Sequence, residues 1–149
     1  MMPHVFDHTG FITPSLEKSV AFWTEVMGFE PRPIVERSGE WVPPFTGIDG
    51  ATLRIAHLFS HDAHLEFIEF ATARGEPTAA QANQVAVGHV CFKVDDLDAT
   101  VNKIIAGGGS LAGKITTITE GAAAGIRGLY MRDPLGVLIE LLEKAPAKG

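Results

Sequence analysis

Two stretches of this chain place a glutamate inside an apolar strand: Leu65-Glu66-Phe67 and Val137-Leu138-Ile139-Glu140-Leu141-Leu142. Side chains alternate between the two faces of a strand, so Leu138, Glu140 and Leu142 share one face. A buried carboxylate without a partner is costly, and such a glutamate therefore needs a partner. One isolated glutamate of this kind usually pairs with an arginine or lies on an open sheet face. Its repetition in two similar stretches favours a shared divalent metal ion instead.

The elements expected around the two glutamates follow one another in the same order in both halves of the chain. In the first half we expect a strand, a helix that begins at Thr13-Pro14 and ends at Gly28, an irregular stretch around Trp41, and further strands. In the second half a helix begins at Asp95-Asp96 and ends at Gly107. The expected strands cover residues 5–13, 29–37, 51–59, 64–71, 87–94, 114–119, 127–131 and 137–142. The chain is therefore predicted to be two tandem βαβββ modules of an α+β fold.

Two histidines repeat in the same way as the two glutamates. His8 and His89 each lie in the first strand of a half, a few residues before its helix. Together with Glu66 and Glu140 they form a set of two imidazoles and two carboxylates, which suits Ni, Co, Mn, Fe or Zn. His64 shares a strand face with Glu66 and is the best alternative ligand.

Length, charge and cysteine content exclude several other classes of protein. The chain has 149 residues, enough for one domain with a proper core, and a formal net charge of −6, which argues against a nucleic-acid binder. The single cysteine, Cys91, excludes an internal disulfide and a cysteine-based zinc site. No apolar run approaches the roughly 18 residues of a membrane span, and residues 1–7 do not resemble a signal peptide. We therefore expect a cytoplasmic protein without a membrane segment.

Nearly the whole chain, about residues 5 to 143, resembles the vicinal oxygen chelate superfamily. This family includes glyoxalase I, methylmalonyl-CoA epimerase, extradiol dioxygenases and fosfomycin- or bleomycin-resistance proteins. The resemblance is carried by His8 with residues 16–23 (LEKSVAFW) and 27–29 (MGF), by residues 88–90 (GHV) and 94–97 (VDDL), and by residues 133–141 (DPLGVLIEL). The superfamily is well marked by these motifs, whereas a particular reaction is not.

The resemblance implies a fold, a metal site and a reaction type. It implies one domain over 1–149, with module one at about 4–72, a linker at 73–86 and module two at 87–144, curved into a cup-shaped mixed sheet around the metal. The family's metal positions fall on His8, Glu66, His89 and Glu140. A filled set of this kind is similar to glyoxalase I and the epimerase, which form an enediolate or enolate from a small carbonyl or thioester substrate. Glu140 is then the expected base, Glu66 acts on the opposite face, and a homodimer is expected.

Other positions depart from particular relatives. Glyoxalase I has an arginine and an asparagine where this chain has Ile12 and Phe70, so an apolar pocket wall is expected and glutathione is disfavoured as substrate. Cys91 and Tyr130 are further candidates for substrate contact, although a buried thiol and a strand tyrosine are the simpler explanations. An Fe-dependent extradiol dioxygenase, suggested by Tyr130 and opposed by Glu66, stays an alternative, as does a metal-free drug-binding protein of the same fold.

Overall fold

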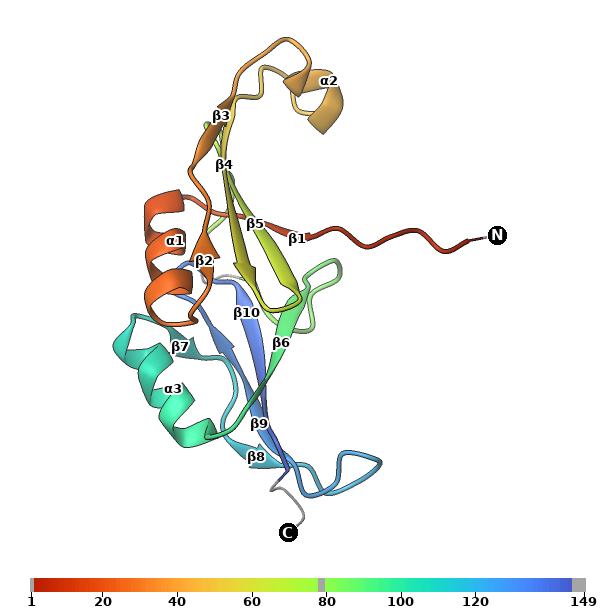
Figure 1. Ribbon diagram of the computed structural model, residues 1–149, viewed down its shortest axis with the longest axis vertical. Helices are drawn as coiled ribbons and strands as arrows, with labels where there is room; N and C mark the ends of the chain where they lie inside the picture. Colours follow the sequence, from red (N-terminus) through yellow and green to blue (C-terminus); the bar gives the residue numbers. More distant parts are fainter. Residues whose placement is uncertain (1, 78–79, 146–149) are drawn as a thin grey trace. The chain divides into compact units, whose positions relative to one another are not determined.

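The computed structural model describes residues 2–77 and 80–145, and the chain divides into two compact units, Met1–Gly75 and Glu76–Gly149 (Figure 1). The first unit contains β1 (Thr9–Ile12), α1 (Leu16–Glu25), β2 (Glu30–Pro31), β3 (Val35–Arg37), α2 (Val42–Thr46), β4 (Leu53–Ser60) and β5 (Ala63–Phe70). The second contains β6 (His89–Val94), α3 (Leu97–Ala106), β7 (Ser110–Leu111), β8 (Thr116–Thr117), β9 (Arg127–Arg132) and β10 (Leu138–Glu143). The boundaries that we expect for the two modules and their linker stay a prediction.

Each unit builds one five-stranded mixed sheet with the same connectivity. In the first, the strand order is β1-β5-β4-β2, with β3 also on β4, and in the second it is β6-β10-β9-β7, with β8 also on β9. The first strand of each unit pairs in parallel with the last, and the other pairs are antiparallel. The predicted α+β fold of two βαβββ modules is therefore confirmed, with the second strand of each module broken into two short pieces.

The local boundaries differ from the sequence prediction at three places in the first unit. Residues 5–8 lie outside the strand, since β1 begins at Thr9. Helix α1 is capped by Ser15, whose hydroxyl accepts a hydrogen bond from the Lys18 amide, and not by Thr13. The expected irregular stretch after Trp41 forms the short helix α2. Its two prolines fall in the first turn, where a missing N–H leaves no helical hydrogen bond unmade.

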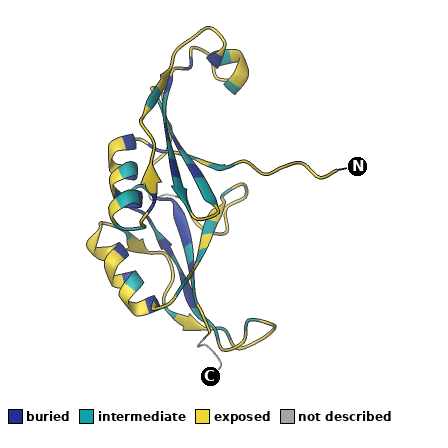
Figure 2. Ribbon diagram, viewed as in Figure 1, coloured by how far each residue is buried: buried dark blue, intermediate teal, exposed yellow. Residues whose placement is uncertain are grey.

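The core of each unit lies between its long helix and the face of the sheet that the helix covers (Figure 2). In the first unit Trp23 of α1 is fully buried, and its ring centroid lies 5.6 Å from that of Phe67 in β5. In the second, α3 buries Leu97, Val101 and Ile104. Phe67 in β5, like Ile139 and Leu141 in β10, is buried and lies one residue from a glutamate. Alternation along a strand therefore directs Glu66 and Glu140 to the sheet face opposite the helix.

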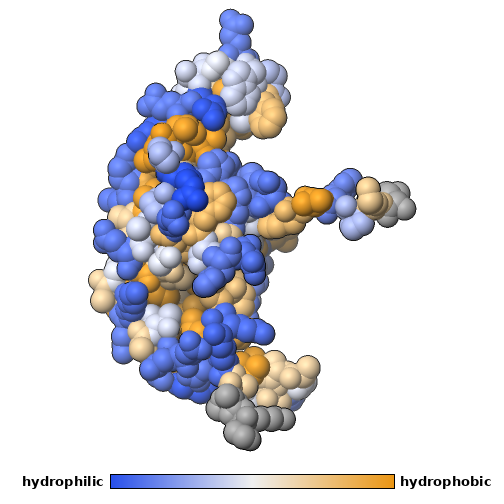
Figure 3. Space-filling view, in the orientation of Figure 1, coloured by the Kyte–Doolittle hydropathy of each residue, from blue (hydrophilic) through white to orange (hydrophobic). Residues whose placement is uncertain are grey.

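Apolar side chains are exposed on two parts of the first unit. The extended segment before β1 carries Val5 and Phe6, and the region around α2 carries Trp41 and Phe45 (Figure 3). Helix α2 is anchored by Val42, which is fully buried against Ala51 and Leu53. Among residues 2–77 and 80–145, no helix combines the length and apolar character that crossing a membrane requires.

Candidate functional site

The first unit brings two of the predicted ligands into contact. His8 immediately precedes β1, Glu66 lies in the middle of β5, and the two strands pair in parallel with Gly10 opposite Glu66. The Nε2 atom of His8 is 3.4 Å from Oε1 of Glu66. Only 14% of the Glu66 side chain is exposed, so the carboxylate depends on protein groups for its polar contacts.

The second unit repeats this arrangement with the other two predicted ligands. Strand β6 begins at His89 and pairs in parallel with β10, which carries Glu140. The Nε2 atom of His89 is 2.9 Å from Oε2 of Glu140, and the two side chains are 40% and 27% exposed. Each unit thus contributes one imidazole and one carboxylate from equivalent places in the sheet.

Each glutamate also has a neighbour on both flanking strands. The paired rows are Gly10, Glu66 and His57 in the first unit, and Cys91, Glu140 and Tyr130 in the second. Directly paired residues point to the same face of a sheet. The predicted substrate residues Cys91 and Tyr130 therefore flank Glu140, and the ring centroid of Tyr130 lies 5.0 Å from that of His89.

Both neighbours of Glu140 hold their protons tightly. Burial raises the pKa of the Cys91 thiol, and the Glu140 carboxylate raises it further. Burial also raises the pKa of the Tyr130 phenol, and Glu140 again adds to the effect. At neutral pH the phenol and the thiol are therefore protonated and able to donate hydrogen bonds next to the carboxylate.

Three imidazoles and two carboxylates of the first unit form a closed ring of contacts. Asp7 Oδ2 is 2.5 Å from His8 Nδ1, whose other ring nitrogen faces Glu66. The second carboxylate oxygen of Glu66 is 3.5 Å from His57 Nε2, and His57 Nδ1 is 2.9 Å from His64 Nε2. His64 Nδ1 closes the ring at 4.0 Å from Asp7 Oδ2. We refer to Asp7, His8, His57, His64 and Glu66 as the histidine ring.

The charges of the ring act on one another in two ways. The hydrogen bond to His8 lowers the pKa of Asp7, and the same bond raises the pKa of His8. Burial, by contrast, lowers the pKa of His57. At neutral pH His57 is therefore uncharged, and one of its two ring nitrogens carries no proton and can accept a hydrogen bond.

Sequence analysis identified His64 as an alternative ligand but missed the place of His57. His57 reaches Glu66 because β4 and β5 form a hairpin in which Ser60 pairs with Ala63. This register places His57 directly across from Glu66. The residues between the strands, His61 and Asp62, were the available indication of that turn.

The predicted pocket residues Ile12 and Phe70 both line one cavity of the first unit. Its volume is about 650 Å³, and it is also lined by Ile48 and by the charged residues Asp49 and Arg74, with Gly47, Thr72 and Ala73. Ile12 continues the strand face of Gly10, as Phe70 continues that of Glu66. One wall of the cavity is apolar, as expected, and two opposite charges lie elsewhere on its lining.

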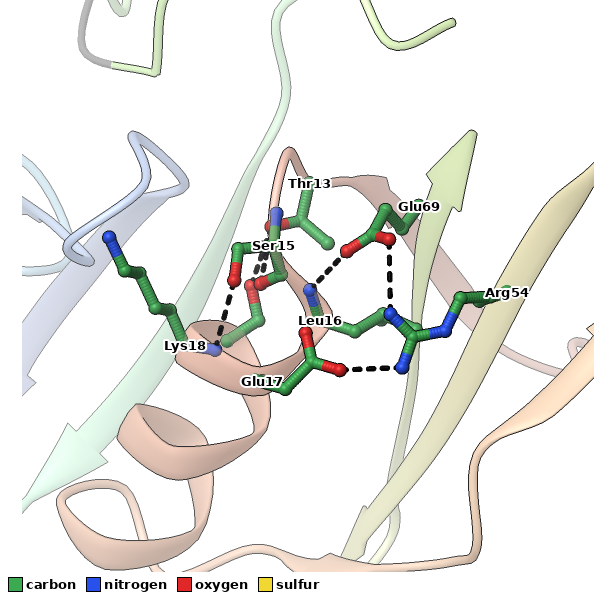
Figure 4. Close-up of polar contacts among 8 residues, drawn as sticks. Thr13, Ser15, Leu16, Glu17, Lys18, Arg54 and Glu69 are labelled. Carbon is green, nitrogen blue, oxygen red and sulfur yellow. Dashed lines mark hydrogen bonds and ion pairs between the residues drawn. The ribbon is translucent and has the colours of Figure 1, made fainter. Parts of the chain in front are cut away.

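The same arrangement of polar contacts in both units connects the strand that carries the site glutamate to the start of the long helix. Glu69, three residues after Glu66, accepts a hydrogen bond of 2.8 Å from the Leu16 amide at the start of α1 (Figure 4). Arg54 of β4 donates to Glu69 and to Glu17 in the first turn of the helix. The exposed amides of a helix N-terminus favour a carboxylate at this place. The strand that carries Glu66 is thereby held to α1.

The second unit contains the same arrangement of hydrogen bonds and ion pairs, made by different residues. Glu143, three residues after Glu140, accepts from the Leu97 amide at the start of α3 at 3.2 Å. Arg127 bridges Glu143 and Asp98 in the first helical turn. The repetition extends the resemblance of the two units from their backbone to their polar contacts.

The two His–Glu pairs have the chemistry and spacing of metal ligands. Imidazole nitrogen and carboxylate oxygen are the donors that divalent transition metals accept in proteins. Two ligands each about 2.1 Å from one ion, at right angles, lie about 3 Å apart. The distances of 3.4 Å and 2.9 Å within the two pairs fit such an ion.

Comparisons with known proteins found one family model and two similar proteins. Residues 5–141 match the family model of the Glyoxalase/Bleomycin resistance protein/Dioxygenase superfamily. The chain is 31% identical to a 2-epi-5-epi-valiolone epimerase of an Actinomyces species over 140 residues, which cover 91% of this chain and 76% of the relative. It is 26% identical to a probable lactoylglutathione lyase of Vibrio parahaemolyticus, over 95% of this chain and 92% of that protein.

A solved structure is similar over the same length. The crystal structure of a glyoxalase family protein from Bacillus cereus matches with a TM-score of 0.80 and 26% identity, and the match covers 95% of this chain and 94% of that chain. The resemblance stated from the motifs is thus confirmed by sequence and by fold. This chain belongs to the Glyoxalase/Bleomycin resistance protein/Dioxygenase superfamily.

Proposed function

We propose that this protein is a metal-dependent enzyme of the glyoxalase or epimerase type, a lyase or isomerase that forms an enolate or enediolate from a small carbonyl or thioester substrate. The observation that carries the proposal is the repeated pair of imidazole and carboxylate, His8 with Glu66 and His89 with Glu140. The superfamily membership and the epimerase and lyase names of the relatives support an enzyme of this kind.

The four residues His8, Glu66, His89 and Glu140 would hold one divalent ion of Ni, Co, Zn, Mn or Fe. Such an ion, when bound, supplies a Lewis acid that polarises the substrate carbonyl. We further propose a homodimer, in which the two pairs of one centre come from a single chain or from both chains.

Glu140 is the proposed base, and its neighbours orient the substrate. The Glu140 carboxylate takes the proton from the carbon next to the carbonyl. Glu66 donates a proton to the opposite face of the same carbon, as inversion there requires. Tyr130 lies directly across from Glu140, and burial raises the pKa of its phenol. The phenol therefore keeps its proton and donates a hydrogen bond to a substrate oxygen, and Cys91 packs on the other flank.

The cavity of the first unit gives the proposal a substrate preference. Ile12 and Phe70 form its apolar wall, and Arg74 is the cation on its lining. We propose that this cavity takes the part of the substrate remote from the reacting carbon. A hydroxylated ketone or a thioester fits the proposal better than glutathione, because no arginine stands at Ile12 to hold a glutathione carboxylate.

The test combines metal analysis with exchange of the α-proton. Protein purified without added metal is analysed for bound metal, reconstituted, and incubated in D₂O with a panel of hydroxyketones and thioesters followed by NMR. We expect exchange with at least one substrate, lowered by about 10² or more in Glu140→Gln because the base is lost. Glu36→Gln, which removes an exposed carboxylate of β3, is the matched control. Absence of exchange across the panel with metal bound contradicts the proposal.

Two alternatives are distinguished by other measurements. A ring-cleaving dioxygenase is favoured by the pairing of Tyr130 with Glu140, and oxygen uptake with catechols in Fe-loaded protein would reveal it. A metal-free drug-binding protein of the same fold would bind no metal in the analysis.

A further inference from the structure

The histidine ring gives the first unit a larger set of metal donors than the proposed centre uses. Asp7, His8 and His64 each offer one ligand atom, and these atoms all lie within 4.8 Å of one another. We propose that these three residues can hold a divalent ion that prefers imidazole, such as Zn²⁺, Co²⁺, Ni²⁺ or Cu²⁺. This site shares His8 with the four-residue centre, but it takes no ligand from the second unit.

The ring nitrogens of the two histidines are arranged for such a role. His8 turns Nδ1 toward Asp7 and Nε2 toward Glu66, so one imidazole faces two different carboxylates. His64 turns Nδ1 toward Asp7, while its Nε2 contacts His57 at 2.9 Å. Histidine ligands usually have the second ring nitrogen held by a hydrogen-bonding partner, which fixes the orientation of the ring. His57 supplies that partner for His64.

The three donor groups favour one class of metal ion, and their exposure makes the site accessible from solvent. Two imidazoles and one carboxylate suit Zn²⁺, Co²⁺, Ni²⁺ and Cu²⁺, whereas Mg²⁺ and Ca²⁺ prefer oxygen ligands alone. The Asp7 side chain is 80% exposed, and His8 and His64 are partly buried at 32% and 21%. An ion can therefore reach the site from solvent and still be held by side chains that packing restrains.

The second unit provides a comparison within the same molecule. Gly88 precedes His89 as Asp7 precedes His8, and Leu138 lies two residues before Glu140 as His64 lies two before Glu66. Tyr130 takes the place of His57 across from the glutamate. Because three of the five groups of the histidine ring have no ligating equivalent there, the additional site belongs to the first unit alone.

The experiment titrates metal-free full-length protein with Co²⁺ and Zn²⁺, following the visible absorption of bound Co²⁺ and the heat of Zn²⁺ binding. The variants are Asp7→Asn, His64→Ala, His64→Gln and the double variant His89→Ala with Glu140→Ala. His61→Asn is the matched control, because it removes an imidazole from the same hairpin at a residue with φ of 44°, a conformation that asparagine tolerates. Circular dichroism shows which variants are folded.

We expect the double variant of the second unit to retain a bound ion. We expect Asp7→Asn and both His64 variants to bind this ion at least about tenfold more weakly, because each has lost a ligand. The absorption bands of Co²⁺ should change in the same variants and stay unchanged in His61→Asn. If the double variant loses all metal while the His64 variants bind as the wild type does, this site is overturned and the four-residue centre stands. If the wild type binds no metal, both proposals are overturned.

Discussion

The Cys91 thiol reports on the charge of Glu140, because the two residues pair directly across β6 and β10. Burial raises the pKa of the thiol, and the Glu140 carboxylate raises it further. Glu140→Gln removes the negative charge, so the pKa should fall and more thiolate should be present at a given pH. Since the thiolate is the nucleophile, iodoacetamide should alkylate the variant faster, with a rate profile moved to lower pH.

Mass spectrometry can follow this reaction at one site, because Cys91 is the single cysteine of the chain. Glu120→Gln, which removes an exposed carboxylate of the same unit, is the control and should leave the profile unchanged. An identical profile in Glu140→Gln and the wild type would contradict the contact between thiol and carboxylate.

Gly128 determines how closely β9 approaches β10. A Cβ atom at this position would lie 2.5 Å from the Leu141 carbonyl oxygen and 2.8 Å from Leu142 Cδ2. Gly128→Ala should therefore lower the free energy of unfolding by about 1–3 kcal/mol through overpacking. In Gly113→Ala the new Cβ comes no closer than 3.7 Å, so urea denaturation should detect little change. Equal losses in the two variants would contradict this account.

The four candidate ligands could be proposed from the sequence because the pattern that marks each of them is local to one strand. A glutamate flanked by apolar residues, as in Leu65-Glu66-Phe67, marks its own face whatever the neighbouring strand is. His57 could not be placed in the same way, because its contact with Glu66 depends on the register of β4 against β5. That register follows from the position of a two-residue turn, and a shift by one residue would move His57 to the other face.

In each unit, a glutamate three residues after the site glutamate accepts a hydrogen bond from the start of the long helix. Glu69 accepts from the Leu16 amide and Glu143 from the Leu97 amide. Glu69→Gln and Glu143→Gln should each lower the free energy of unfolding by about 1–2 kcal/mol, because a hydrogen bond to a charged acceptor is replaced by a neutral one. Urea denaturation measures both, and Glu30→Gln, at an exposed position of β2, is the control. A loss in one unit only would argue against equivalent roles.

The Arg54 bridge makes the stability of the first unit depend on pH in a defined direction. The hydrogen bond from Arg54 lowers the pKa of the Glu17 carboxyl from its ordinary value. A carboxyl with a lowered pKa in the folded state stabilises the protein above the unfolded value, and this contribution is lost as pH falls through the folded value. The stability difference between wild type and Arg54→Met should therefore be constant near neutral pH and shrink below about pH 4.5.

Urea denaturation between pH 7 and pH 3 checks this expectation. Arg37→Met is the control, because Arg37 donates to the backbone carbonyl of Glu36, which does not titrate. A stability difference for Arg54→Met that stays constant down to pH 3 would contradict a role for the Glu17 carboxylate.

The long elements could be predicted from the sequence better than the short ones. Helix α3 and its cap Asp96 follow from periodicity and from the capping preference of aspartate. The N-cap of helix α1 is Ser15 and not Thr13 as expected. Thr13 is instead buried and hydrogen-bonds to Ser19. Helix α2 was missed because its prolines lower helix propensity in general but not in the first turn.

At the scale of the whole molecule, the two units share a fold but differ around their glutamates. The order of elements and the placement of one histidine and one glutamate in each unit are visible as a repeat in the sequence. The difference between the units depends on contacts between strands: His57 and His64 surround Glu66, whereas Cys91 and Tyr130 flank Glu140. The two units therefore share a backbone arrangement but surround their glutamates with chemically different side chains.

The proposed centre takes two ligands from each unit, so metal binding should stabilise both units together. A ligand that binds only the folded state adds about 2.7 kcal/mol at a concentration one hundred times its dissociation constant. Adding metal to metal-free protein should therefore slow amide hydrogen exchange in β1 and β5 and also in β6 and β10, as measured by mass spectrometry. The His89→Ala, Glu140→Ala double variant should confine the slowing to the first unit. Slowing in the first unit alone in the wild type would leave the histidine ring as the metal site and exclude the four-residue centre.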